Sequence, residues 1–275
     1  MTQAAQLEKL SLDLGSGVKL ELVKCPAGKF MMGSPETENG HSVYEGPRHE
    51  VNFTEPFYMG IYPVTREQWV QVMGGDPSEG SKHHKARFLQ PEHLGKMVEG
   101  DPSQFPGKPT QPVDSVSWKD AQEFCKRVSA LTGKKVHLPS EAEWEYACRA
   151  GSTARFCFGD DPACKELTEY AWFTANSNDY TYPVGQKKPN DWGIYDMHGN
   201  VVEWMQDGLH YTYEGAPTDG SSWEANHKIT PSGECRMMRG GCNNSHGEGC
   251  RSAGRDWGPK KNRCGDVGFR VAASM

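Results

Sequence analysis

The sequence predicts an α+β domain, because helical patterns are few, candidate strands are short and the connections between them are long. Its 31 Gly and 18 Pro residues are spread along the chain and do not gather in one linker, so residues 1–275 are expected to form a single domain. The 8 Trp, 10 Tyr and 10 Phe residues are enough to anchor a sizeable core.

Three helices are predicted, over residues 65–74, 118–133 and 140–151, and each ends at a glycine. The first and third open with capping boxes, in which a Ser or Thr and a Gln or Glu three residues later satisfy free backbone N–H groups. Short strands are expected at 20–23, 28–32, 50–53, 57–61, 236–239 and 268–272. The segments 74–108 and 208–234, rich in Gly, Pro and charge, are predicted surface insertions.

No apolar run in the sequence approaches the length of a membrane span, and residues 1–15 lack the pattern of a signal peptide. We therefore expect a soluble chain without a transmembrane segment. If a leader or lipoprotein signal preceded Met1, the expected location is the cell surface or another extracytoplasmic compartment.

The net charge of −6 is unevenly distributed. Residues 236–275 contain eight Lys and Arg residues and three acids, so their net charge is +5 and that of the rest of the chain is −11. A basic end can serve an anionic ligand or a nucleic acid, but no basic run with interleaved aromatic residues occurs, so no nucleic-acid partner is expected. We expect Arg239, Arg251, Arg255 and Arg270 to pair instead with acids from the part of the chain before residue 236, which we call the body.

Nine cysteines occur without a CxxC pair and without histidines at zinc-ligand spacing, so no zinc site is predicted. Cys125 and Cys148 lie in apolar helical patterns and are expected to be buried. Cys157 and Cys164 either close a short disulfide loop or stay free, and the sequence favours neither. The cysteines that cluster around the C-terminal segment are Cys235, Cys242, Cys250 and Cys264.

The C-terminal segment, residues 239–270, carries Gly and Arg at both ends and a mixture of small, polar and ionisable residues between them. We name Gly240, Gly241, Arg251 and Phe269 its framework residues. The residues between them follow neither a helical stripe nor a strand alternation, which indicates side chains chosen for display and not for packing.

Several short sequence motifs along the chain together resemble the motifs of one protein family. They are PAGKFMMGS at 26–34, GPRHEV at 46–51, FYMGIYPVTREQW at 57–69, PVDSVSWKDAQEFC at 112–125, HLPSEAEWEYACRAG at 137–151 and PVGQKKPNDWGIYDMHGNVVEW at 183–204, followed by RGG at 239–241 and GFRVA at 268–272. In this order they resemble the formylglycine-generating-enzyme, or sulfatase-modifying-factor, family. The resemblance implies that family's variant of the C-type lectin fold, with a ligand surface built largely from the C-terminal portion. A fold alone does not establish an activity.

The resemblance also implies an alternative, catalytic function. Formylglycine-generating enzymes oxidise a substrate cysteine with two cysteines, separated by four residues, that bind copper, and thiolate sulfur suits the soft cuprous ion. Here the candidates are Cys242 and Cys250, separated by seven residues, and Ser245 stands where the resemblance places the first catalytic cysteine. Because this spacing departs from the enzymes, we expect a non-catalytic protein that requires no cofactor.

Structural calcium is a further implication of the resemblance. Asn200, Val201 and Glu203 match positions that supply side-chain and backbone oxygens to one calcium site of the family, and such oxygens suit Ca²⁺. The alternative is that Asn200 and Glu203 bond to buried backbone, and the sequence does not decide between the two. At a second calcium site of the family, this chain has Gly185 in place of an acid.

Within the family, the C-terminal segment is similar to the variable proteins of diversity-generating retroelements, most of all to the Treponema variable protein. Such elements mutate adenines, and Asn codons ending in a pyrimidine then yield Asn, Ser, His, Gly, Asp and Cys but not Glu, Trp or Lys. The compatible residues are Asn243, Asn244, Ser245, His246, Gly254, Asp256, Gly258, Cys264, Gly265 and Asp266. The constant members of the same surface would be Glu248, Trp257, Lys260 and Lys261.

These features favour a non-catalytic, receptor-like or adhesin-like protein whose site comprises the compatible residues together with Cys242, Glu248 and Trp257. Trp257 is the expected anchor, because an exposed Trp offers a large contact area and Asp256, Gly258 and Pro259 beside it are not typical of a core. The alternative is that Trp257 belongs to the core. The expected partner is a protein or surface molecule, and the protein is expected to be a monomer.

Overall fold

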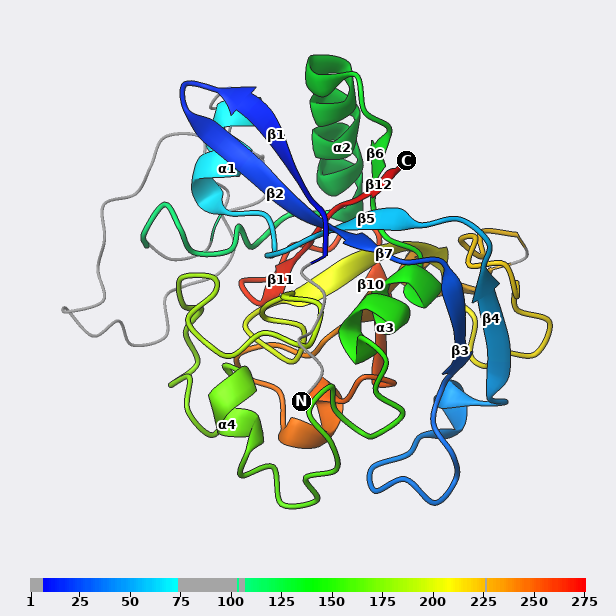
Figure 1. The fold of residues 1–275 in the computed structure, drawn as a ribbon. Helices are drawn as coiled ribbons and strands as arrows, with labels where there is room; N and C mark the ends of the chain where they lie inside the picture. Colours follow the sequence, from blue (N-terminus) through cyan, green and yellow to red (C-terminus); the bar gives the residue numbers. More distant parts are fainter. Residues whose placement is uncertain (1–6, 74–102, 104–106, 226) are drawn as a thin grey trace.

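The computed structural model describes residues 7–73, 103, 107–225 and 227–275 (Figure 1). Its strands are β1 Lys9–Gly15, β2 Val18–Cys25, β3 Gly28–Met32, β4 His49–Phe53, β5 Phe57–Gly60, β6 Val136–His137, β7 Val202–Gly208, β8 Ile229–Thr230, β9 Gly233–Arg239, β10 Arg255–Pro259, β11 Val267–Gly268 and β12 Ala272–Ser274. The helices are α1 Arg66–Met73, α2 Trp118–Thr132, α3 Glu141–Arg149 and α4 Leu167–Tyr170, with 3₁₀ turns η1 Val43–Glu45 and η3 Gly247–Cys250. Short strands, few helices and long loops make this the predicted α+β fold.

Helices α1 and α2 pack on a sheet that joins the two ends of the described chain (Figure 1). Its strand order is β1-β2-β5-β12-β6, so the C-terminal β12 lies between β5 and β6. Ser117 begins α2 with a capping box, and Gly133 ends it with a left-handed φ of +70°. The buried ring of Phe124 lies 5.9 Å from that of Trp69 and 5.3 Å from that of Phe269. This core therefore ties both helices to the C-terminal framework.

The second sheet carries the C-terminal segment. Its strands follow the order β10-β9-β7-β11, with β8 paired to β9, so β10 forms an outer edge. Strand β10 runs antiparallel to β9, from the Arg255 and Arg239 pair to the Pro259 and Cys235 pair. Residues 240–254 therefore connect β9 to β10 at one end of this sheet. Helix α3 contacts both β7 and β9.

The three helices predicted from the sequence are confirmed, together with their capping boxes. At the start of α1, the Thr65 backbone N–H donates to the Gln68 side chain at 2.9 Å. At the start of α3, the Ser140 hydroxyl accepts from the Glu143 backbone N–H at 3.0 Å. None of the helices in the described ranges combines the length and apolar composition that crossing a bilayer requires.

The predicted strand over 268–272 is wrong, because the chain changes sheets within it. Strand β11 pairs with β7 in the second sheet, and β12 pairs with β5 and β6 in the first. Between them the Phe269 carbonyl accepts from the Val64 N–H at 2.9 Å, and the Val271 carbonyl accepts from the Gly60 N–H at 2.8 Å. These bonds replace a continuous ladder, so the segment joins the two sheets.

The two predicted surface insertions differ in what the structure describes. Most of 74–108 lies outside the described residues. Segment 208–234, apart from residue 226, is tied to the body at its base, where Asp207 accepts backbone N–H groups of Trp223 and Glu141 at 2.8 and 2.9 Å. The Trp223 ring also stacks on His210, with centroids 3.5 Å apart. The segment is therefore held against the start of α3.

A buried ion pair connects the end of the chain to β7. Arg270 donates to the two carboxylate oxygens of Glu203 at 2.7 and 2.8 Å. The same guanidinium donates to the carbonyls of Gly60 and Tyr195 at 2.9 and 3.0 Å, and Glu203 also accepts from the Trp144 indole at 2.8 Å. Both charges are thus paired and hydrogen-bonded, which burial of a charge requires.

Replacing Arg270 with Gln is expected to lower the free energy of unfolding by about 3–5 kcal/mol, because Glu203 would stay buried without its cation. The control is Lys29→Gln, which breaks an ion pair with Glu50 whose side chains are 60% and 56% exposed. This control should cost less than about 1 kcal/mol. Urea denaturation followed by tryptophan fluorescence measures both, and equal losses would contradict the role assigned to Arg270.

Candidate functional site

The site begins at the Gly240-Gly241 turn that follows β9. Both residues have positive φ, +102° and +66°, a backbone region that favours glycine. A Cβ on Gly241 would lie 2.8 Å from Sγ of Cys250, and a Cβ on Gly240 would lie 3.1 Å from the Trp144 ring. Backbone conformation therefore favours glycine at both positions, and close packing adds to this preference most strongly at Gly241.

Arg239, directly before this turn, is a buried residue that binds the C-terminal segment through its side chain. It is fully buried, pairs with Glu145, and donates to the carbonyls of Ala253 and Gly254 at 2.8 and 2.7 Å. Burial acts to raise the pKa of Glu145, but Arg149 and Arg239 outweigh it and lower that pKa overall. The carboxylate therefore stays charged, and the pair fixes the course of residues 253–254.

Two further arginines, Arg251 and Arg255, fix the chain where it leads into β10. Arg251 donates to Glu45 at 2.5 Å and to Glu38 at 2.7 Å. Arg255 donates twice to Glu141, at 2.9 and 2.8 Å. All four arginines expected to pair with acids of the body therefore do so, and their charges are already compensated.

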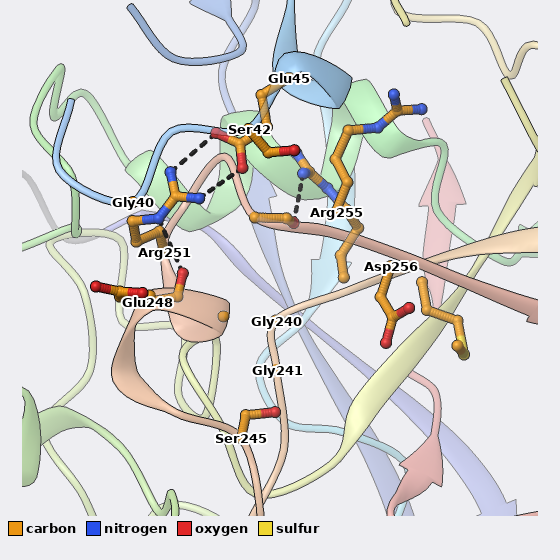
Figure 2. Close-up of a pocket in the computed structure, with 14 residues that line it drawn as sticks. Gly40, Ser42, Glu45, Gly240, Gly241, Ser245, Glu248, Arg251, Arg255 and Asp256 are labelled. Atoms are coloured by element: carbon orange, nitrogen blue, oxygen red, sulfur yellow. Dashed lines mark hydrogen bonds and ion pairs between the residues drawn. The ribbon is translucent and has the colours of Figure 1, made fainter. Parts of the chain in front are cut away.

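A hollow of about 290 Å³ opens between the C-terminal segment and residues 40–45 (Figure 2). Its walls come from the loop before β4, the end of β9, the turn η3 and the start of β10. Five of its 14 lining residues are glycines, so peptide groups form much of the wall. We name this cavity the site hollow.

Four residues of the predicted site line the site hollow: Ser245, Glu248, Gly254 and Asp256. Glu248 and Asp256 lie on opposite sides of it in Figure 2, and both reach the surface. Desolvation raises the pKa of Asp256, and the nearby Asp266 acts in the same direction. The hollow is therefore lined by oxygen acceptors that a ligand with hydrogen-bond donors would satisfy.

A hydrogen-bonded cluster lies next to the site hollow and brings together further predicted residues. The Cys242 sulfur lies 3.1 Å from Oδ1 of Asn244 and 3.2 Å from the Ser245 hydroxyl. Asn244, which is exposed, donates to the half-buried Asp266 at 3.1 Å. A change at one of these positions would thus alter the hydrogen bonding of the others.

The remaining predicted residues are not equally accessible. Cys242 and Asn243 are only 5% and 4% exposed, so their side chains are not displayed, contrary to the expectation from the sequence. The Asn243 backbone is also fixed, because its N–H donates to the Asn200 carbonyl at 3.0 Å and its carbonyl accepts from the Ser177 hydroxyl at 2.5 Å. Among the others, Gly258 is buried, Cys264 and Gly265 are half-buried, and His246 is exposed.

Trp257 is half-buried and meets two tyrosines that the sequence does not single out. Its ring meets Tyr44 and Tyr211 edge to face, with centroids 5.2 and 5.9 Å apart. The Trp257 ring also packs against a buried core cluster. Both interpretations of Trp257 therefore hold in part, because one side of the residue belongs to the core and another reaches the surface.

Cys242 and Cys250 do not have the environment of reactive thiols. Burial raises the pKa of Cys242 to about 12, with Asp266 acting in the same direction, and burial also raises the pKa of Cys250 well above its ordinary value. Thiols with a raised pKa are neutral at pH 7 and are poor nucleophiles and metal ligands. All nine cysteines are free thiols, so the loop between Cys157 and Cys164 is not closed by a disulfide.

The side chains of two predicted calcium ligands, Asn200 and Glu203, are already engaged by protein groups. Asn200 accepts from and donates to the backbone of Tyr182, at 3.0 Å in each direction. Both carboxylate oxygens of Glu203 accept from Arg270, and Val201 is fully buried. Within the described ranges, no group of three or more His, Cys, Asp or Glu side chains is placed to hold a metal ion. As arranged, these residues do not fit a Ca²⁺ site.

The fold defines a loop-rich C-type lectin-like domain, and the site hollow lies against its C-terminal segment. Residues 18–275 match the family described as the sulfatase-modifying factor enzyme 1-like domain. The chain belongs to this family, which confirms the resemblance found in its sequence.

Two solved structures are similar over nearly the whole chain. PvdO from Pseudomonas aeruginosa is 33% identical, with a TM-score of 0.81, covering 97% of this chain and 98% of its own. Treponema denticola variable protein 1 is 25% identical, with a TM-score of 0.72, covering 97% of this chain and 99% of its own. The second similarity supports the resemblance of the C-terminal segment to variable proteins.

Curated relatives carry other names. The serine/threonine-protein kinase pkn1 of Chlamydia caviae is 32% identical over 93% of this chain, which spans only 38% of that protein. The formylglycine-generating enzyme of Streptomyces coelicolor is 33% identical over 91% of this chain and 88% of its own length. The family thus includes proteins with enzyme names, and the function of this chain must be argued from its own site.

In the folded protein, Cys242 and Cys250 are expected to resist iodoacetamide at neutral pH, because both thiols are buried and uncharged. Cys157 is only half-buried and should react faster, so it is the internal reference. Peptide mass spectrometry after timed exposure measures each site, and urea should make all three reactive. Rapid labelling of Cys242 in the folded chain would contradict the assignment and favour an oxidase.

Proposed function

We propose that residues 239–270 form the ligand-binding site of a non-catalytic, receptor-like or adhesin-like protein. The observation that carries the proposal is the separation of two kinds of residue in one segment. Arg239, Arg251 and Arg255, which we call the framework arginines, are paired with glutamates from earlier in the chain. Asn244, His246, Glu248 and Asp256 instead reach the surface. Exchanging an exposed side chain on such a framework changes ligand contacts without refolding the domain.

We further propose that a diversity-generating retroelement varies this segment. The support is the similarity to the solved structure of Treponema denticola variable protein 1, together with the Asn, Ser, His, Gly, Asp and Cys content between the framework residues. Glu248 and Trp257 lie outside the products of adenine mutation in Asn codons and supply constant contacts. The partner proposed for such a site is a protein or surface molecule, met at the cell surface by a monomer.

Oxidation of a protein cysteine is the second candidate, supported by relatives named formylglycine-generating enzymes at up to 33% identity. It assigns the redox chemistry to Cys242 and Cys250. That chemistry needs accessible thiolates, and both sulfurs lie in surroundings that favour the neutral thiol. The burial of the two thiols therefore weighs against this candidate, and the alkylation of Cys242 separates it from the first.

A display library tests the ligand-binding proposal. Randomising Asn244, Ser245, His246 and Asp256 and selecting against a panel of immobilised proteins should enrich variants specific for different targets, because Ser245 and Asp256 line the site hollow and Asn244 and His246 are exposed on the same segment. The control library randomises Lys119, Glu123, Lys126 and Ala130 on α2. Single substitutions at the exposed positions Asn244, His246 and Asp256, and at the control positions, should change the free energy of unfolding by about 0.5 kcal/mol or less. Equal enrichment from the two libraries would refute the proposal.

Sequencing the 3′ end of this gene in sibling isolates tests the retroelement proposal. Substitutions should concentrate at adenines in codons 242–266 and be most frequent where the side chain is exposed, as at Asn244 and His246. Codons for Arg239, Gly240 and Gly241 should stay constant because buried pairing and positive φ constrain them. A uniform density of changes along the gene, or changes that avoid adenines, would show that no such element acts here.

A further inference from the structure

Residues 41–47 form a ridge between two hollows. On one side, the site hollow takes Ser42 and Glu45 into its lining (Figure 2). On the other side, a second hollow of about 490 Å³ is lined in part by His41 and Val43. Residues that line the two cavities alternate along this segment, so the cavities are neighbours and one extended ligand could contact both.

An exposed aromatic cluster lies at the ridge. Tyr44 comes from the ridge itself, Tyr211 from the segment after β7, and Trp257 from the edge strand β10. The two tyrosine rings are 6.1 Å apart, and they meet Trp257 at interplanar angles of 81° and 77°. Tyr44 and Tyr211 are 39% and 42% exposed, and the adjacent Val43 is 72% exposed. Such a concentration of exposed apolar surface is typical of an interaction site.

The polar tips of these aromatic residues are available to a ligand. Within the described part of the chain, neither tyrosine hydroxyl is hydrogen-bonded, and the Trp257 indole N–H has no acceptor. Tyrosine and tryptophan with one packed side and one free polar group are enriched at protein interfaces. The cluster therefore has the composition of an anchor for a protein partner.

The two hollows carry carboxylates without counter-ions. Among the described residues, no cation pairs with Glu248 or Asp256 of the site hollow, or with Glu36 or Glu214 of the second hollow. The arginines that line the site hollow are paired with buried glutamates, and only Arg48 of the second hollow adds an uncompensated positive charge within the described lining. Four negative charges against one leave a surplus of three negative charges.

We propose that the ridge and its two hollows bind a protein segment that presents lysine or arginine side chains. Tyr44, Tyr211 and Trp257 supply its apolar anchor, and the unpaired carboxylates receive the cations. The inference rests on the proposed function, because it uses the same hollow, and it adds the chemical class of the partner.

The physical argument is one of complementarity. A protonated amine or guanidinium is attracted by an aromatic face within about 6 Å and by a carboxylate in hydrogen-bond range. Asp256 is already partly desolvated, which raises its pKa, so a cation beside it would relieve an existing penalty. A neutral or acidic partner would bury the same carboxylates without compensation, which is unfavourable.

Nuclear magnetic resonance titration of the full chain tests this with three probes, acetyl-Gly-Xaa-Gly-amide with Xaa as Lys, Gln or Glu. The Lys peptide should shift the amide resonances of Glu248 and Asp256 and the indole resonance of Trp257. It should bind at least about threefold more tightly than the Gln peptide, and the Glu peptide should bind least. The double variant Glu248→Gln, Asp256→Asn should lose about threefold to tenfold in affinity for the Lys peptide.

The matched control is Glu55→Gln, Glu67→Gln, which removes the same charge from two exposed acids outside the two hollows and should leave the affinity unchanged. Trp257→Leu should weaken the Lys and Gln peptides alike, because it removes the shared anchor. Equal affinity for the three peptides, or no shift at the hollow with any of them, would overturn the cationic class while leaving the ligand-binding proposal intact. Failure of the display library would instead overturn the ligand-binding proposal itself.

Discussion

Buried pairs of arginine and glutamate are the constraint on which the C-terminal segment depends. Such a pair adds little net stability, because the loss of hydration offsets the attraction between the charges, yet removing one partner leaves a buried charge and is strongly destabilising. Arg239, Arg251 and Arg255 each pair with an acid from another part of the chain and also donate to a backbone carbonyl. The pairs therefore set where the backbone runs. Their net energy matters less than the single arrangement that satisfies them.

Under the proposed function, this arrangement would let exposed side chains beside the site hollow change while the backbone around it keeps its course. Gly240 and Gly241 turn the chain with positive φ angles that favour glycine, and Arg239 donates to the carbonyls of residues 253 and 254. The exposed positions lie between these fixed points and take no part in the buried pairs. A substitution at Asn244 or His246 alters surface chemistry, whereas one at a framework arginine would leave a glutamate uncompensated. Under the proposed function, stability and ligand choice thus depend on different residues of one short segment.

Local signals in the sequence predict the helices and several strands well. The capping boxes at 65–68 and 140–143 and the glycine at 133 lead to α1, α3 and α2, because capping depends on residues close in sequence. Strand β10 is missed because Asp-Trp-Gly-Pro is a pattern typical of loops, and β10 is a strand only through its pairing with β9. The break after Gly268 is missed for the same reason, since it follows from which sheet each half joins.

The candidate site shows the same division between local and distant causes. The framework residues mark the segment, and the pairing of its arginines with the body follows from charge balance. The partners themselves are set by the fold: Glu45 and Tyr44 lie about two hundred residues before Arg251 and Trp257, and no periodicity connects them. The burial of Cys242 and Asn243 depends on packing against elements outside the segment, so composition alone marks them as displayed.

Under the proposed function, the surface combines a constant half with a variable half. Tyr44, Tyr211 and Trp257 supply apolar area, which is not directional and tolerates many partners. The polar positions around the site hollow act through hydrogen bonds, which reject a partner that leaves a buried acceptor unsatisfied. The constant aromatic residues would supply affinity, and the exchangeable polar residues beside them would supply selectivity. Neither role needs a reactive group. The thiols that resemble catalytic residues in sequence can therefore be buried at no cost to binding.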